Sequence, residues 1–98
     1  MSDVKINRVL LDYFVVSFND KTSGSKVFVP TIVTLNPDSN YFYDRIQKYS
    51  IPQEMAETLE LEKNIGKYRG MPISIIGSLQ SYGGNTRIKV EELKVAEK

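Results

Sequence analysis

Basic side chains are the groups in this sequence that most clearly indicate a chemical role. Lys67 and Arg69 precede an apolar run, and Arg87 and Lys89 alternate with apolar residues in the next run. Cations spaced in this way along one face can contact the phosphates of a nucleic acid, whereas the alternative is a solvated surface balanced by nearby carboxylates. The candidate phosphate contacts are Lys21, Lys26, Lys67, Arg69, Arg87 and Lys89.

Aromatic side chains are the second group, because proteins that tolerate many sequences stack bases on aromatic rings. Phe28 shares a predicted strand face with Lys26, which makes it the best stacking candidate. Tyr82 opens the loop Tyr82-Gly83-Gly84-Asn85, which is either a binding loop or an ordinary hairpin turn. We expect core packing for Phe14, Phe18 and Phe42. The secondary stacking candidates are Tyr13, Tyr41 and Tyr43.

The chain contains no cysteine and no histidine. Thiolate chemistry, disulfides and Cys-ligated zinc are therefore excluded, and the usual general base and the commonest metal ligand are missing. Glu57 and Glu60 are three residues apart, but we expect them to be solvated carboxylates and not a metal site. No phosphate-binding loop precedes a helix. The sequence predicts a protein that is not an enzyme and has no cofactor and no metal.

Length and composition predict one globular domain spanning residues 1–98. The net charge of +1 is unevenly distributed, because residues 52–65 hold four glutamates against one lysine, a net of −3 that leaves +4 for the rest of the chain. Nucleic acid would avoid this acidic segment. The apolar run from Val9 to Val16 is too short for a membrane span. The absence of cysteine fits the reducing cytoplasm.

Two strands are predicted in the first third of the chain. Residues 8–18 are rich in β-branched and aromatic side chains and are apolar on both faces, which indicates a central or strongly curved strand. A turn cluster follows at residues 19–25. Residues 26–35 form the second predicted strand, in which Pro30 indicates an edge position or a bulge.

The middle of the chain predicts helical structure. In residues 40–49 the apolar spacing fits a short helix, and a short strand at residues 41–43 is the alternative. Ser50 and Gln53 are spaced as a capping box, which predicts the start of a second helix with Pro52 in its first turn. The apolar stripe of this helix continues to Ile65, and Gly66 is the expected C-cap.

Two more strands are predicted at residues 71–81 and 86–95. Gly77 lies inside the first of them, which indicates a bulge or tight coiling of the strand. In the second strand Val90 should point inward, and Leu93 keeps the same orientation only if a bulge occurs near Glu91 and Glu92. Arg87 and Lys89 should point outward.

Two architectures fit this order of elements. One is an OB-fold, a small curled antiparallel β-barrel with a helix between its third and fourth strands. The other is an open four-stranded antiparallel sheet with two helices on one face. The doubly apolar first strand and the two predicted bulges favour the barrel, whereas the lack of a clear third strand favours the open sheet.

Residues 66–95 resemble the second half of bacterial single-stranded DNA-binding proteins. In that family a helix ends in a tyrosine and a lysine–glycine turn, a strand of alternating apolar residues reaches Gly-x-Leu, and a long loop leads to a strand with Arg, Val and Glu. The family's third strand with its binding aromatic, and its acidic tail with a hydrophobic tip, have no counterpart here. The matching residues are Tyr68, Gly70, Gly77, Leu79, Arg87 and Val90.

This resemblance implies an OB-fold protein that binds single-stranded DNA, or RNA, with little sequence preference, and that forms homo-oligomers. The departures indicate a small phage, plasmid or mobile-element variant with a role in DNA replication. The alternative is a protein-interaction module, an accessory or inhibitor protein of a phage or mobile element without a nucleic-acid role. The near-neutral charge and the acidic segment fit this alternative.

Overall fold

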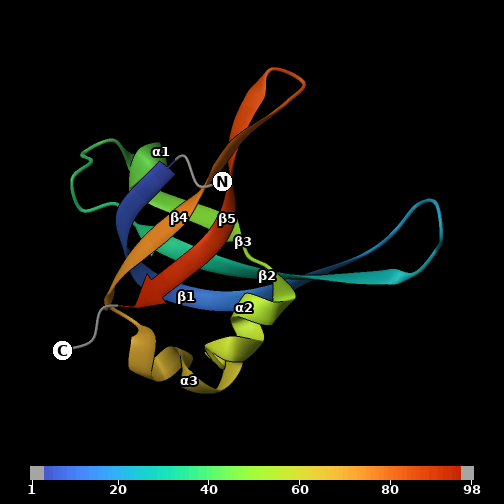
Figure 1. Ribbon diagram of the computed structural model, residues 1–98, viewed down its shortest axis with the longest axis horizontal. Coiled ribbons are helices and arrows are strands. Elements are labelled where there is room, and N and C mark those ends of the chain that lie inside the picture. The colour runs from blue at the N-terminus through green and yellow to red at the C-terminus, as the bar shows by residue number, and fades with distance from the viewer. Residues whose placement is uncertain (1–3, 96–98) are drawn as a thin grey trace.

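The computed structural model describes residues 4–95, apart from the side chains of Tyr82 and Asn85. The chain is mainly β, and its five strands form one antiparallel sheet in the order β3-β2-β1-β4-β5 (Figure 1). The strands are β1 (Val4–Asn19), β2 (Lys26–Leu35), β3 (Ile46–Ser50), β4 (Pro72–Tyr82) and β5 (Asn85–Val95). The short helices are α1 (Phe42–Arg45), α2 (Gln53–Thr58) and α3 (Leu61–Tyr68).

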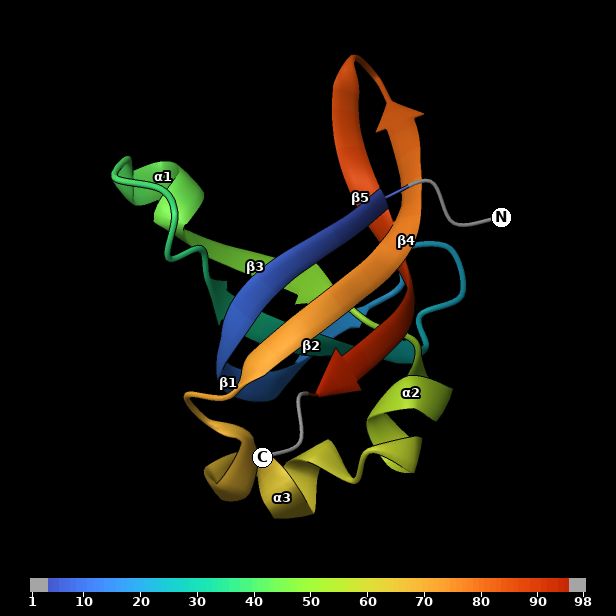
Figure 2. The same cartoon turned by 60° about the vertical axis from the view of Figure 1, so that its left-hand side comes forward.

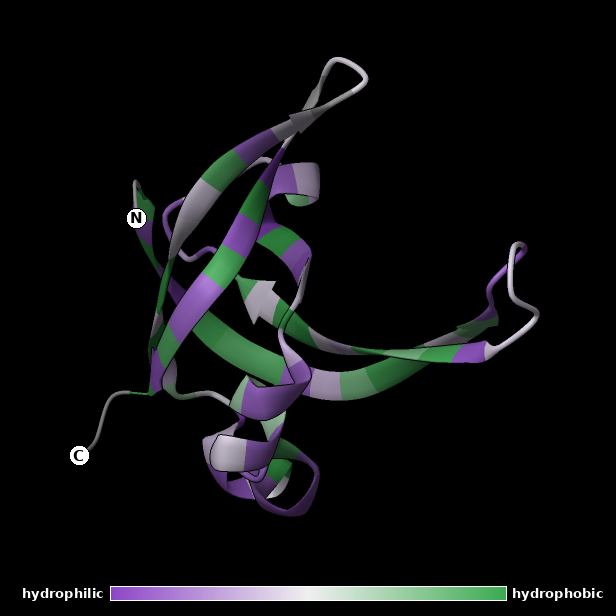
Figure 3. Cartoon of the chain, turned by 45° about the vertical axis from the view of Figure 1, so that its right-hand side comes forward, coloured by the Kyte–Doolittle hydropathy of each residue, from purple (hydrophilic) through white to green (hydrophobic). Residues whose placement is uncertain are grey.

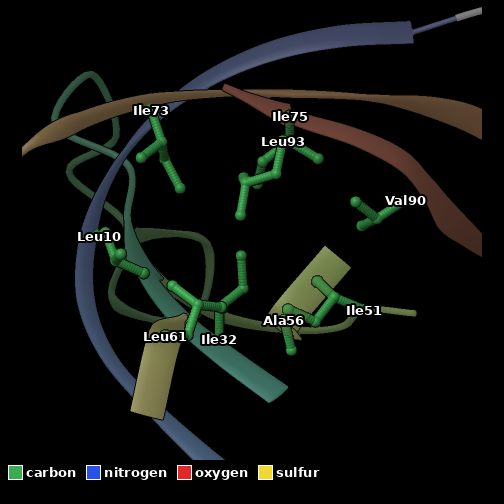
Figure 4. Close-up of a cluster of buried hydrophobic side chains, with 9 residues drawn as sticks. All are labelled: Leu10, Ile32, Ile51, Ala56, Leu61, Ile73, Ile75, Val90 and Leu93. Atoms are coloured by element: carbon green, nitrogen blue, oxygen red, sulfur yellow. The ribbon is translucent and has the colours of Figure 1, made fainter. Parts of the chain in front are cut away.

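The sheet curls around one hydrophobic core, and α2 and α3 cover one end of it (Figure 2). Alternation along β4 directs Ile73 and Ile75 inward, while Leu61 at the start of α3 enters the core from the helical end. No helix in residues 4–95 is long and apolar enough to cross a membrane. The buried apolar residues, shown in Figure 4, are Leu10, Ile32, Ile51, Ala56, Leu61, Ile73, Ile75, Val90 and Leu93.

The sheet is open between β3 and β5. These edge strands approach to within 8 Å between Cα atoms, but no ladder of hydrogen bonds joins them in the described residues. The closed barrel that we expected first is therefore not completed by strand pairing. The sheet also differs from the expected four-stranded alternative, because it contains a fifth strand.

A bulge at Glu91 keeps β5 in phase with the core. The ladder between β4 and β5 skips Glu91 where Val90 pairs with Gly77. Val90 and Leu93 therefore both point inward and are 2% and 7% exposed. The predicted bulge is confirmed. The predicted edge position of Pro30 is also confirmed, because it lies one residue beyond the part of β2 that pairs with β3.

β3 begins within residues 40–49, where the sequence predicted a short helix or, as the alternative, a strand at residues 41–43. Only Phe42–Arg45 is helical, and the following five residues pair with β2. The predicted helix is therefore right only for Phe42–Arg45, and the alternative strand at residues 41–43 is wrong. The apolar spacing that looked helical spans two different elements, and pairing with β2 decides the conformation of the second one.

The predicted helix from Ser50 to Ile65 is divided into α2 and α3. Ser50 is the last residue of β3 and not a cap, because α2 begins after Pro52. Glu60 breaks the helix with a left-handed backbone at φ 49°. Gly66 lies inside α3, so its prediction as the C-cap is wrong. Leu61, the first residue of α3 after this break, is fully buried in the core.

Three phenylalanines that we expected in the core are exposed. Phe14, Phe18 and Phe42 are 37%, 52% and 71% exposed. The first two lie on the part of the β1–β2 hairpin that projects beyond the body of the protein, residues 13–30, which we call the arm (Figure 3). Apolar alternation in a strand shows which residues share a face, but it does not show whether anything covers that face.

Candidate nucleic-acid interface

A groove of about 700 Å³ separates β3 from β5. Residues 47–52 form one wall, and Gln80 with residues 86–90 forms the other. The charged side chains in this lining are Lys48, Arg87 and Lys89, and no described lining residue is a carboxylate. The groove is therefore a cationic surface in a chain whose net charge is only +1.

The groove also contains uncharged surface between its cationic side chains. Tyr49 and Gln47 lie on its β3 wall, where the Tyr49 hydroxyl donates a hydrogen bond to Oε1 of Gln47. Half-buried Ile88 and buried Val90 lie on the opposite wall. Apolar and aromatic surface between cations has the chemical character required for bases and sugars between phosphates.

Carboxylates gather in a different recess, on the α2 side of β5. Glu54, Glu91 and Glu92 line a hollow of about 310 Å³ together with apolar residues of α2 and β5. Of the acidic segment, Glu54 lines this hollow and not the groove, and Pro52 lies between the two because it lines both. Cations and carboxylates thus line different hollows, and a polyanion in the groove would meet the cations.

The predicted residues Arg87 and Lys89 are exposed and lie together on the groove. The structure places Lys21 and Lys26 on the arm, where Nζ of Lys26 is 5.8 Å from the centre of the Phe28 ring. Phe28 is 59% exposed. Five of the eight predicted site residues therefore lie on the groove or on the arm.

The arm begins where the groove ends. The Ile51 amide, which lies in the groove lining, donates a hydrogen bond of 2.9 Å to the Pro30 carbonyl at the base of the arm. Phe28 is two residues farther out on the same face of β2, and Lys26 follows after two more. The Phe28 ring therefore lies on the arm, beyond the end of the groove at Ile51.

Lys67 and Arg69 lie elsewhere. They precede β4, which begins at Pro72. Arg87 pairs with Gln80, which lies eight residues and roughly 26 Å farther along that strand than Pro72. Nη2 of Arg69 forms an ion pair of 2.9 Å with Asp12. The structure therefore does not bring these two residues into one stripe with Arg87. The Tyr82 side chain lies outside the described part of the chain.

Lys48 and Tyr49 were missed by sequence reasoning. Both belong to β3, and the sequence offered no clear signal for that strand. Nζ of Lys48 also lies 5.9 Å from the Phe14 ring centre. Of the secondary stacking candidates, Tyr13 packs against the core, whereas Tyr41 and Tyr43 are exposed at α1 and contact each other at 5.5 Å between ring centres.

Within residues 4–95 no cluster of three or more acidic, cysteine or histidine side chains could hold a metal ion. Comparison with protein-family models, with curated proteins and with solved structures finds no match to this chain.

Proposed function

We propose that this chain is a non-catalytic protein that binds single-stranded nucleic acid in the groove between β3 and β5, with little sequence preference. The observation that carries this proposal is the lining of the groove, where Lys48, Arg87 and Lys89 occur without a carboxylate. Single-stranded DNA is the ligand that the resemblance of residues 66–95 favours, and single-stranded RNA offers the same phosphates and bases.

The strand order supports an OB-fold that is open at one seam. The helices α2 and α3 come between β3 and β4, and the two edge strands face each other across the groove. In OB-folds the β1–β2 and β4–β5 hairpins flank the nucleic-acid site. Here the arm and the β4–β5 hairpin project from the body in different directions (Figure 1).

Binding would combine two kinds of contact. The three cations of the groove neutralise phosphates, which makes affinity depend on salt. Phe28, which lies beyond the end of the groove, stacks on a base that leaves it, and stacking accepts every base because each has a π-face. Neither contact reads base edges, so little sequence preference follows.

The test is fluorescence anisotropy with a labelled oligo-dT over a series of salt concentrations. We expect Arg87→Gln/Lys89→Gln to weaken binding and to reduce the slope of log K against log salt by about 1.4, or about 0.7 for each lost phosphate contact on a single strand. Lys48→Gln should reduce the slope by about 0.7.

The matched control is Lys63→Gln/Lys94→Gln, which removes the same charge from α3 and from the other end of β5. We expect this variant to keep the wild-type slope. An equal loss of slope in the control would show a delocalised charge effect and would overturn the groove as the site. Binding of oligo-rU at equal affinity would extend the ligand class to RNA.

A protein-interaction module is the second candidate function, and the exposed apolar arm favours it. Phe18 and Phe28 are 52% and 59% exposed on this arm, a surface typical of protein contacts. The same titration separates the two functions, because a module without a nucleic-acid role would give no change in anisotropy at micromolar protein and low salt.

A further inference from the structure

One edge of β1 is unpaired along the arm. β1 pairs with β4 only as far as Val9, whereas its pairing with β2 continues to Asn19. Among the described residues, no strand lies along the other edge of β1 from Tyr13 to Asn19. β1 is therefore an inner strand of the sheet near Val4–Val9 and an edge strand along the arm.

The hydrogen-bonding direction along this edge follows from Pro30. Its carbonyl accepts from Ile51 on the β3 side, so Pro30 and its partner Val15 turn their backbone groups away from each other. Val15 therefore directs its N–H and C=O to the free edge of β1, and Ser17, two residues farther along, does the same. Two residues thus present backbone donors and acceptors for a further strand.

This edge lacks the charged residues and the prolines that normally protect an edge strand. Between Asp12 and Asp20 β1 has no charged residue and no proline, whereas the outer edge of β2 carries Lys26 and Pro30. Proteins usually blunt exposed edges with lysine or proline. The β1 edge is therefore the one open to pairing.

The faces of the arm are apolar as well. Phe14, Val16 and Phe18 share one face of β1 and are 37%, 40% and 52% exposed. A two-stranded hairpin with no further partner is marginally stable in water, and a third or fourth strand is what usually stabilises one. The arm therefore offers an apolar surface to a further strand.

We propose that the occupant is a second copy of this chain, whose β1 pairs antiparallel with β1 about a two-fold axis at Val16. In this register Val15 of each copy exchanges backbone hydrogen bonds with Ser17 of the other copy. Phe14 lies directly opposite Phe18 of the second copy, and the symmetry repeats this aromatic pair. Pairs of aromatic side chains across strands stabilise a sheet, and a two-fold axis makes one neutral edge complementary to itself.

Charged groups meet at the two ends of the arm in this register, where Asp12 lies opposite Asp20 of the second copy, next to the Arg69 guanidinium that pairs with Asp12. Tyr13 at the base of one arm lies opposite Asn19 at the tip of the other, and Lys26 is the β2 partner of Asn19. Glu62 of α3 lies near Tyr13, since burial and then this carboxylate raise the pKa of the Tyr13 phenol. Lys26 at each tip therefore approaches Glu62 at the base of the second copy.

Light scattering coupled to size exclusion tests the dimer without nucleic acid, so its result is independent of the proposed function. We expect a mass of 22.4 kDa, twice the 11.2 kDa of one chain. A mass of 11.2 kDa at submillimolar concentration would overturn the proposal.

Single cysteines test the register, because the chain has none of its own. Val16→Cys should form a disulfide-linked dimer on oxidation, since Cα atoms of a non-hydrogen-bonded pair lie about 4.5 Å apart, within disulfide range. The control is Val29→Cys, the β2 partner of Val16 on the same face, which should stay monomeric on a denaturing gel. Linkage through residue 29 in place of residue 16 would overturn pairing through β1.

Charge reversal tests the contact between tip and base. Lys26→Glu and Glu62→Lys should each raise the dimer Kd roughly tenfold, since two symmetric surface pairs change from attraction to repulsion. The double variant should return the Kd close to that of the wild type. Two single variants with weaker dimers and no recovery in the double variant would overturn this register.

Discussion

A Cβ atom on Gly77 would lie 2.1 Å from the backbone carbonyl oxygen of Lys89. The two strands approach this closely because β5 bulges at Glu91, next to the pair formed by Gly77 and Val90. The nearest atoms belong to backbone and not to the end of a flexible side chain, so a larger residue would have to displace β5. Gly77 therefore sets the path of the strand that carries Arg87 and Lys89.

Gly77→Ala should lower the free energy of unfolding by about 1–3 kcal/mol, the usual cost of overpacking, or more because backbone is the obstacle. Urea denaturation measures this change. Gly66→Ala is the matched control, because a Cβ there meets nothing within 4 Å inside α3. It should stabilise the protein by about 0.4–1 kcal/mol. Equal stability of the two variants would contradict the role of the close approach.

The ion pair between Asp12 and Arg69 should make stability fall in acid. The hydrogen bond from Arg69, and then that from the Tyr13 amide, lower the pKa of Asp12 below its ordinary value of 3.8. As pH falls, the unfolded chain therefore takes up this proton before the folded protein does. The stabilisation is complete well above pH 3.8 and is lost as pH falls through the lower pKa of the folded state.

Asp12→Asn is the variant that measures this effect. Its urea midpoint should lie below that of the wild type at pH 6, and the difference should narrow toward pH 2 as the wild-type carboxylate becomes protonated. Arg69→Gln should show the same narrowing. A difference that stays constant with pH would show that the pair does not couple to titration of Asp12.

Phe28→Ala should weaken binding of oligo-dT by about 1–3 kcal/mol, the usual cost of one lost stacking contact. Phe42→Ala on α1 is the control, since both rings are exposed, at 59% and 71%. Each variant should keep the stability of the wild type within about 0.5 kcal/mol, as is usual for surface substitutions. Equal affinity of the two variants in the anisotropy assay would remove Phe28 from the binding surface.

Strands with strong local signals could be predicted from the sequence. The boundaries of β2 match the prediction, and the bulge at Glu91 followed from the phase of Val90 and Leu93 alone. These features are visible because β-branched residues and period-two alternation act within a few residues of each other. β3 left no such signal, since it is five residues long and alternates exposed with half-buried side chains.

The candidate site was predicted in part for the same reason. Arg87 and Lys89 alternate with apolar residues inside a clear strand, so their exposure on β5 could be foreseen. Lys48 could not be found, because its position depends on pairing between β3 and β2. Arg69 was placed in the stripe because it is near Arg87 in the order of elements, whereas the length of β4 separates them.

The sequence by itself determined the residue types, the absence of histidine and cysteine, and the alternation that orders the side chains along each strong strand. Only the tertiary structure decided which faces are covered. Alternation is a local property of the backbone, but burial depends on whether another element lies against a face. For this reason Leu10 is fully buried in β1, while Phe18 on the same strand is 52% exposed at the end of the arm.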